Sequence, residues 1–176
     1  ISDYRDINPK FGTMEDMGRL FAEAAKRDIK IVMDLVVNHT SDEHPWFQQS
    51  RDPKSPYRDY YIWRPPAPNG GPPNNWTSFF MGSAWTLDPQ SGEYYLHLFD
   101  PKQPDLNYHN PRVIEEVKDI LRFWLDKGTA GFRCDVINVL YKTSLDDGVR
   151  RVAVTGLEHY KSQEGTHRIL RELRSD

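Results

Sequence analysis

The segment GFRCDVINVL, residues 131–140, places two charged side chains, Arg133 and Asp135, in a run that otherwise has the composition of a buried strand. An unpaired buried charge is among the most costly groups in a fold, so such carboxylates are usually paired. The alternation of side chains along a strand puts this pair on the opposite face from Cys134 and Val136. Pairs of this kind occur as structural ion pairs at strand ends and as catalytic groups, and the spacing alone favours neither.

A second set of polar residues ends another strand-like segment, KIVMDLVVNH, residues 30–39. Its near-continuous apolar run, rich in valine and isoleucine, is typical of a parallel strand covered on both faces. Parallel strands have their carboxyl ends at the same edge of a sheet. We therefore expect two carboxylates, a histidine, an amide and an arginine to share one edge: Asp34, Asn38, His39, Arg133 and Asp135.

Two amphipathic helices are predicted to position these strands. The first, from about 13 to 27, begins with Thr13 followed by Asp16, a capping-box pattern. The second begins at Asn110 and Pro111 and ends at Gly128, before a strand over 131–138. The resulting order of helix, strand, long insertion, helix and strand predicts parallel strands with right-handed crossovers, in an α/β sheet or barrel.

The long insertion, residues 40–109, is called the excursion below. It contains eleven of the thirteen prolines and four of the five tryptophans, and it is too long for a structureless connection. GEYYLHLF, residues 92–99, predicts a strand after the turn DPQSG. The excursion therefore predicts a small irregular subdomain, with its tryptophans mostly in a core. It leaves the carboxyl end of a parallel strand, which is the functional face of such folds.

Composition excludes several classes of partner. The net charge of -3 and the lack of a basic stripe argue against nucleic acid and against an anionic membrane surface. Nothing approaches the ~20 apolar residues of a membrane span. Cys134 is the only cysteine, which excludes an internal disulfide, favours a reducing, cytoplasmic location and predicts a small buried side chain. No metal or cofactor motif is present.

Three ordered motifs resemble conserved regions of the α-amylase superfamily, glycoside hydrolase family 13. DLVVNH (34–39) and GFRCDV (131–136) resemble the first and second regions, and QPDLN (103–107) resembles the fifth in its oligo-1,6-glucosidase form. MGSAW (81–85) and YRDYYIW (57–63) resemble the inserted domain of the same subfamily. The resemblance implies part of a (β/α)8 TIM barrel over residues 1–39 and 110–176. Residues 40–109 would then be domain B, inserted after the third barrel strand.

The resemblance also implies roles for the polar edge. Asp135 matches the nucleophile of a retaining glycosidase, and an adjacent arginine typically lowers the pKa of such a carboxyl by ~1 to 3 units. His39 matches a histidine that binds the sugar at the cleaved bond, although a strand-end histidine can also cap backbone groups. Asp34 matches a carboxylate that orders Arg133, although turn amides can also satisfy it.

Three further residues are assigned more loosely. Asn38 is grouped with the substrate-binding residues, and Val136 resembles members that cleave α-1,6 bonds. Asp105, like His97, is as compatible with holding domain B together as with a role in the site.

The function implied is an exo-acting α-glucosidase or oligo-1,6-glucosidase that acts on short α-glucosides through a glucosyl-Asp135 intermediate. Trehalose synthase or another family transglycosylase is the first alternative, because it shares half of the mechanism. A non-catalytic heavy chain of an amino-acid transporter is the second, and the presence of Asp135, Arg133 and His39 argues against it. The family's acid glutamate and third carboxylate are expected outside this chain, so the isolated 176 residues are expected to be inactive.

Overall fold

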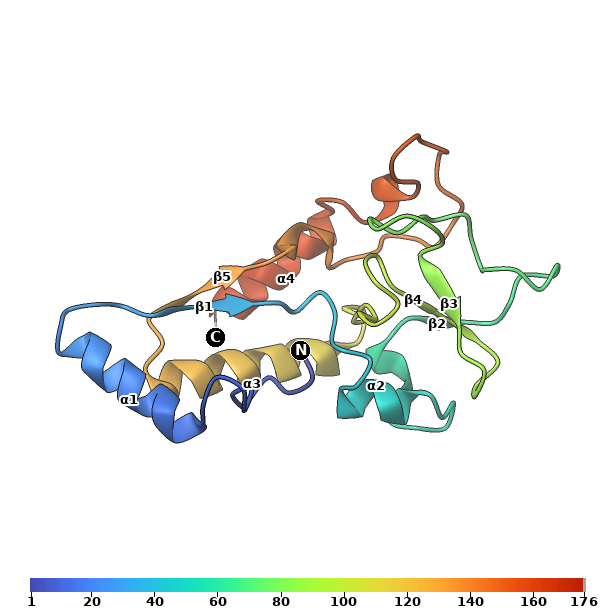
Figure 1. Cartoon of the computed structure of the whole chain (residues 1–176). Coiled ribbons are helices and arrows are strands. Elements are labelled where there is room, and N and C mark those ends of the chain that lie inside the picture. Colours follow the sequence, from blue (N-terminus) through green and yellow to red (C-terminus); the bar gives the residue numbers. More distant parts are fainter. Residues whose placement is uncertain (176) are drawn as a thin grey trace.

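The computed structural model describes residues 1–175, in two parts that Figure 1 shows side by side. One part holds β1, β5 and three helices, and the other holds a short helix and a small sheet. The helices and strands are α1 (Met14–Ala25), β1 (Val32–Leu35), α2 (Pro45–Ser50), β2 (Trp63–Arg64), β3 (Trp85–Leu87), β4 (Tyr94–Leu96), α3 (Pro111–Lys127), β5 (Gly131–Cys134) and α4 (Glu164–Ser175). Single 3₁₀ turns occur at Arg58–Tyr60, Ile137–Val139 and Leu157–His159.

Helix α1 begins where its capping box predicts. The hydroxyl of Thr13 accepts a hydrogen bond from the Asp16 amide (3.2 Å), and the Asp16 carboxylate accepts one from the Thr13 amide (2.8 Å). Phe21 and Ala24 on one side of the helix are buried. These reciprocal bonds satisfy amides that a helix start otherwise leaves unpaired.

Helix α3 covers the strand pair and is also bounded as predicted. The Asn110 side chain accepts a hydrogen bond from the Arg112 amide (3.0 Å), and Gly128 ends the helix in the left-handed conformation with φ 113°. The buried residues lie on one face: Val113, Ile114, Val117, Ile120 and Trp124. The Trp124 indole donates to the Tyr4 carbonyl (2.7 Å), which holds the N-terminal segment beside α3 (Figure 1).

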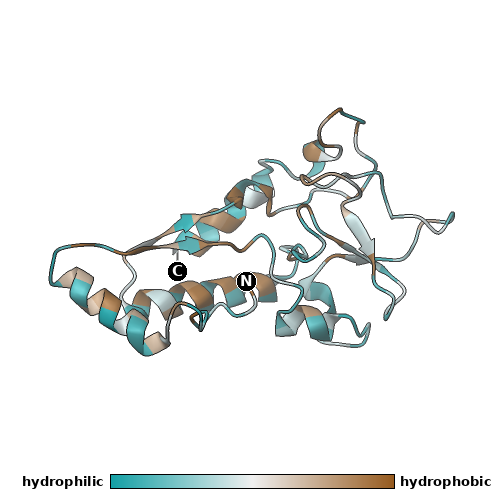
Figure 2. Ribbon diagram, in the orientation of Figure 1, coloured by the Kyte–Doolittle hydropathy of each residue, from teal (hydrophilic) through white to brown (hydrophobic). Residues whose placement is uncertain are grey.

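Strands β1 and β5 are parallel, with Asp34 opposite Arg133 in the register, and this confirms the α/β class. Both strands are shorter than predicted. On β1, the chain leaves β5 after Leu35, and residues 38–40 bond instead to residues 104–106 of the excursion. On β5, Val136 adopts φ 42° and ψ 34°, a left-handed conformation that ends the strand. Figure 2 shows hydrophilic residues at the ends of these strands, whereas α1 and α3 carry residues of both kinds.

The excursion contains a three-stranded antiparallel sheet in the order β2, β4, β3. The predicted turn joins β3 to β4: the Asp88 carboxylate accepts the Ser91 amide (2.8 Å), and Gly92 has φ 70°. The four tryptophans of the excursion are buried, as predicted: Trp46, Trp63, Trp76 and Trp85. They stabilise two cores, of which the second also includes Val139 and Tyr160 from the chain after β5.

No helix within residues 1–175 is long and apolar enough to cross a membrane.

Candidate active site

A guanidinium joins two carboxylates at the carboxyl ends of β1 and β5. Arg133 Nη1 lies 2.8 Å from Asp34 Oδ1, and Nη2 lies 2.7 Å from Asp135 Oδ1. The hydrogen bond to Asp34 and the charge of Asp135 raise the pKa of Arg133. The guanidinium always carries its charge, and its two terminal nitrogens hold one oxygen of each carboxylate in a fixed position. The structure therefore brings together the three charged residues that the sequence placed at one edge.

The three side chains differ in their access to solvent. Arg133 and Asp34 are 64% and 53% exposed, whereas Asp135 is 33% exposed. The Asp135 amide donates to the Leu35 carbonyl (3.0 Å), which extends the strand ladder by one bond. The next residue, Val136, is β-branched and has a positive φ, a combination that is rare and strained. The backbone thus turns sharply directly after the carboxylate.

His39 lies at the same edge and is 5% exposed. Burial lowers its pKa, while the negative charges of Asp105 and Asp135 act in the opposite direction. Its Nε2 lies 3.1 Å from the amide nitrogen of Gln103, and its ring packs 5.4 Å from the Phe99 ring. The lowered pKa favours the neutral ring, whose two nitrogens contact the side chains of Asn38 and Gln103.

Phe99 belongs to a group of rings beside His39, defined here as the aromatic wall: Phe79, Phe80 and Phe99. Phe79 stacks on Phe99 with ring centroids 5.0 Å apart, and Phe80 meets Phe99 edge-on at 5.8 Å. Phe80 is 63% exposed, so part of the wall faces solvent. The wall and the charged edge therefore meet at His39.

Asn38 and Asp105 form the support beneath His39. Asn38 is fully buried, and its amide nitrogen lies 3.3 Å from Asp105 Oδ2 and 3.3 Å from His39 Nδ1. The structure places this side chain below His39 and does not bring it to the exposed edge. Asp105 also accepts the Leu98 amide (2.9 Å), which ties it to the excursion.

Lys142 is a site residue that the sequence reasoning missed. Its ammonium lies 2.6 Å from Asp105 Oδ2, and it also donates to the carbonyls of Val139 (3.0 Å) and Leu140 (3.3 Å). It thereby fastens the chain just beyond Asp135 to the excursion. In the sequence, Lys142 simply follows two apolar residues and a tyrosine. No local pattern pairs it with Asp105, which lies 37 positions earlier.

His97 has a local role in the small sheet. Its Nε2 lies 2.8 Å from the Thr86 hydroxyl on the neighbouring strand, and its Nδ1 lies 3.0 Å from the Phe99 carbonyl. Both ring nitrogens therefore contact groups of the excursion. Within residues 1–175, no three histidine, cysteine, aspartate or glutamate side chains gather as a possible metal site.

The prediction that Cys134 is buried is wrong. It is exposed, although its register partner Leu35 is buried. The reason is its place at the end of β5, which pairs only with β1 in the described sheet. Partial burial and the charge of Asp34 raise the pKa of the thiol, so the thiol is a poor nucleophile.

Comparison with known proteins is consistent with this geometry. Residues 1–175 match the family described as alpha amylase, catalytic domain. An oligo-1,6-glucosidase of Parageobacillus thermoglucosidasius is 56% identical over 98% of this chain and 32% of its own length. A palatinase of Erwinia rhapontici is 62% identical over 81% of this chain and 26% of its own length. The chain thus spans about a third or less of the curated relatives it matches.

Solved structures agree closely with the fold. A trehalose-6-phosphate hydrolase of Bacillus licheniformis superposes with a TM-score of 0.95 at 46% identity, over 99% of this chain and 31% of that one. An isomaltulose synthase of Erwinia rhapontici NX5 superposes with a TM-score of 0.94 at 45% identity, over 100% of this chain and 32% of that one. The motifs at 34–39, 103–107 and 131–136 and these matches lead to one conclusion: the chain belongs to the alpha-amylase catalytic-domain family.

Proposed function

We propose that the protein containing this chain is a retaining α-glucosidase of the oligo-1,6-glucosidase type, which hydrolyses short α-glucosides through a glucosyl-Asp135 intermediate. The observation that carries the proposal is the bridge that Arg133 makes between Asp34 and Asp135, beside the neutral ring of His39. Its curated relatives include oligo-1,6-glucosidases and α-glucosidases.

Asp135 is assigned as the nucleophile. Its Oδ1 is engaged by Arg133, so we assign the attack on the anomeric carbon to Oδ2. As the Asp135–sugar bond forms, the bond to the leaving oxygen breaks and an acid protonates that oxygen. Water then displaces Asp135, with the same acid acting as base, and the product retains its configuration. The acid is assigned to the rest of the protein, because Glu158, Glu164 and Glu172 lie outside the family's motif.

Arg133, Asp34 and His39 support this step in different ways. Arg133 orients the Asp135 carboxylate, and Asp34 binds the other terminal nitrogen of the guanidinium. His39 is assigned to a sugar hydroxyl, with Asn38 fixing the ring from below. The Asp135 carboxylate and the His39 ring would thus act on the same sugar ring.

The domain organisation follows the same assignment. Residues 1–39 and 110–176 are proposed as part of a (β/α)8 barrel, with β1 and β5 as its third and fourth strands. Residues 40–109 are proposed as domain B. The support is a parallel strand pair covered by α3, together with a separate antiparallel sheet in the excursion.

Val136 is assigned a part in linkage preference. It directly follows Asp135, and its left-handed backbone turns the chain sharply at this position. A branched apolar residue here resembles members that cleave α-1,6 bonds. Isomaltose-type substrates are therefore proposed over maltose-type ones.

A transglycosylase is the second candidate. Several of the solved structures are a trehalulose synthase or an isomaltulose synthase, at 44–46% identity. Such enzymes also need the nucleophile, and they differ in the acceptor that attacks the intermediate. The ratio of glucose released to glucoside transferred separates the two candidates.

The test uses the full-length protein with isomaltose and with maltose, followed by NMR of the anomeric protons. The proposal predicts release of α-glucose as the first product, faster turnover of isomaltose, and loss of turnover in Asp135→Asn. Release of β-glucose, or an Asp135→Asn variant that retains activity, would overturn the assignment.

A further inference from the structure

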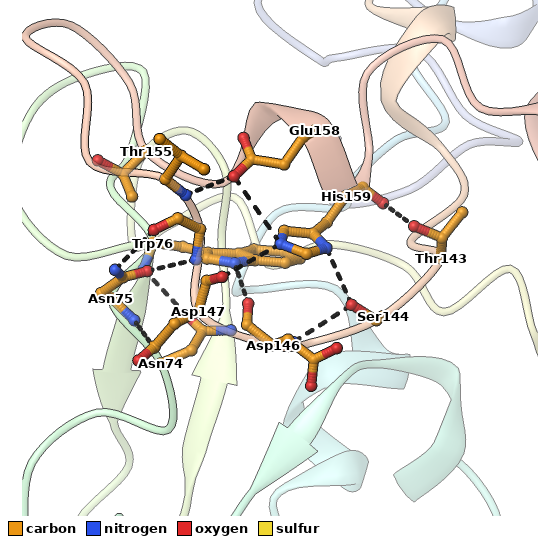
Figure 3. Close-up of polar contacts among 12 residues, drawn as sticks. Asn74, Asn75, Trp76, Thr143, Ser144, Asp146, Asp147, Thr155, Glu158 and His159 are labelled. Carbon is orange, nitrogen blue, oxygen red and sulfur yellow. Dashed lines mark hydrogen bonds and ion pairs between the residues drawn. The ribbon is translucent and has the colours of Figure 1, made fainter.

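Residues 143–160, which follow the proposed nucleophile strand, fold back onto the excursion and are called the clasp. Figure 3 shows polar contacts between residues of the clasp and Asn74, Asn75 and Trp76 of the excursion. Six hydrogen bonds of 2.7–2.9 Å involve side chains: Asn74 Nδ2 to the Leu145 carbonyl, Trp76 Nε1 to the Asp146 carbonyl, Asn75 N to Asp147 Oδ1, Asn75 Nδ2 to the Gly148 carbonyl, the Gly148 amide to Asn75 Oδ1, and the Thr155 amide to Thr77 Oγ1. One backbone hydrogen bond, from the Thr77 amide to the Thr155 carbonyl (3.2 Å), adds to them. No sequence motif singles out this segment.

The contact is also closely packed. The Trp76 ring is 1% exposed and lies nearly parallel to the His159 ring, with centroids 5.6 Å apart. Gly156 has φ 101°, and a Cβ built there would approach the Trp76 ring to 2.6 Å. A side chain at this position would push the clasp off the indole, so glycine is required both by the backbone and by the contact.

One end of the clasp is tied to the chain that carries Asp135. The Ser162 amide, just past the clasp, donates to the carbonyl of Asn138 (2.7 Å), three residues beyond the nucleophile. Thr143 closes the clasp at its base, because its amide (2.8 Å) and hydroxyl (2.9 Å) both donate to the His159 carbonyl. The clasp is therefore attached to the turn after β5.

The other side of the clasp is tied to the aromatic wall. Thr77, which accepts the Thr155 amide, is two residues before Phe79. The Phe79 amide donates to the Leu98 carbonyl (2.8 Å), and its ring meets Tyr160 at the end of the clasp with centroids 6.2 Å apart. The wall continues through Phe99 to His39. The clasp thus contacts both the turn after β5 and the aromatic wall.

We propose that the clasp is a positioning element for the reaction, which sets the spacing between Asp135 and the aromatic wall. Asn75 and Thr77 are its positioning residues, since they hold the clasp without touching the reacting atoms. This inference rests on the proposed function. The two positioning residues lie outside the strands β1 and β5 and outside the sequence motifs that identified the site.

Thr77 offers the sharper test. Thr77→Val keeps the shape of the side chain and removes the oxygen that accepts the Thr155 amide, a buried group. Thr77→Ser keeps that oxygen. Since small misplacements of reacting groups cost up to roughly 100-fold, we expect Thr77→Val in the full-length protein to lower kcat for isomaltose by about 10-fold or more, with a smaller change in KM. The kcat of Thr77→Ser for isomaltose should stay within about twofold of the wild-type value.

Asn75→Asp is the second variant, should Thr77→Val fail to fold. It replaces the amide that donates to the Gly148 carbonyl with an oxygen that repels it. Asn69→Asp is the matched control: Asn69 lies in an exposed turn of the same excursion, and its side-chain oxygen accepts the Gly71 amide, a bond that aspartate retains. We expect the loss of kcat in Asn75→Asp only.

The wild type is assayed first, so that the two proposals are tested separately. Hydrolysis by the wild type with retention of the anomeric configuration establishes the proposed function. Folded Thr77→Val and Asn75→Asp variants with a lowered unfolding temperature but kcat within twofold of the wild type would then overturn the positioning role alone. A wild-type protein without turnover would overturn both proposals.

Discussion

Lys142 and Asp105 form an ion pair that is almost completely removed from solvent, with Nζ 2.6 Å from Oδ2 and side chains 2% and 0% exposed. Lys142 follows the proposed nucleophile by seven positions, and Asp105 supports Asn38 below His39. The pair thus joins the chain beyond β5 to both the excursion and the candidate site. Its carbonyl contacts satisfy the remaining protons of the ammonium group, as a buried charge requires.

Lys142→Met should strongly destabilise the fold, because it leaves the Asp105 carboxylate buried without its cation. Breaking such a pair from one side typically costs about 3 to 5 kcal/mol. The measurement is the free energy of unfolding in urea, with Lys26→Met as control, since Lys26 pairs with Glu23 on the exposed surface. A loss of under about 1 kcal/mol in Lys142→Met would contradict the importance of the pair.

Arg133→Lys should reduce catalysis and leave the fold intact. A lysine ammonium is a point charge and does not reproduce the fork that binds Asp34 and Asp135 together. We expect kcat to fall by roughly 10- to 100-fold, at an unchanged unfolding temperature, since Arg133 is largely exposed. Arg171→Lys is the control, because Arg171 forms an exposed pair with Glu164 on α4. Equal kcat values for wild type and Arg133→Lys would refute the role of the fork.

The burial of His44 should make the folded state less stable as the pH falls. Its Nδ1 accepts the Trp46 amide (3.1 Å), and burial lowers its pKa from 6.5 to about 4, against the charge of Asp3. Above pH 6.5 both folded and unfolded chains hold a neutral ring. As the pH falls from 6.5 to about 4, only the unfolded chain takes up the proton, and the folded state loses roughly 3 kcal/mol.

His44→Asn isolates this contribution, because asparagine caps a helix equally well and does not titrate. The urea midpoint is measured between pH 7 and pH 4 for the wild type and the variant. We expect a shallower decline in the variant, with a residual slope from His39 and His97, whose pKa values burial also lowers. His167→Asn, an exposed histidine on α4, should decline like the wild type. Parallel curves for wild type and His44→Asn would rule out this linkage.

Val136→Thr should change substrate preference. The two side chains have the same shape, so the left-handed backbone is equally strained, but a hydroxyl replaces a methyl group at the residue that directly follows Asp135. A single group in a pocket is worth about 10-fold or more in discrimination, so we expect the isomaltose-to-maltose ratio of kcat/KM to fall by about 10-fold. Val152→Thr, fully exposed in the clasp, should leave the ratio unchanged. If the isomaltose-to-maltose ratio of kcat/KM in Val136→Thr stays within twofold of the wild-type value, Val136 has no role in linkage preference.

The sequence predicted the elements whose causes are local. The capping box at Thr13, the cap at Asn110 and the terminal Gly128 each act within a few residues, so both helices lie where predicted. The parallel pairing of β1 with β5 follows from their order in the chain. The predicted contact of Arg133 with Asp135 is confirmed, because alternation along one strand is sufficient to bring the two side chains together.

The rest depends on partners far away in the sequence. The strand ends are set by the turn at Val136 and by the pairing of His39 with Asp105, neither of which has a local pattern. Lys142 and the clasp were missed for the same reason. The clasp has no helical or alternating period, and its hydrogen-bond partners lie about 70 positions earlier, so only the folded chain shows what it contacts.

Asp135 is proposed to form the covalent bond to the sugar. The most direct measurement is the intact mass and peptide map of the full-length protein after treatment with a mechanism-based fluoroglucoside, which slows release of the intermediate. We expect one fluoroglucosyl group per protein, on the peptide that contains Asp135, and none on Asp135→Ala. A label on any other residue would contradict this assignment.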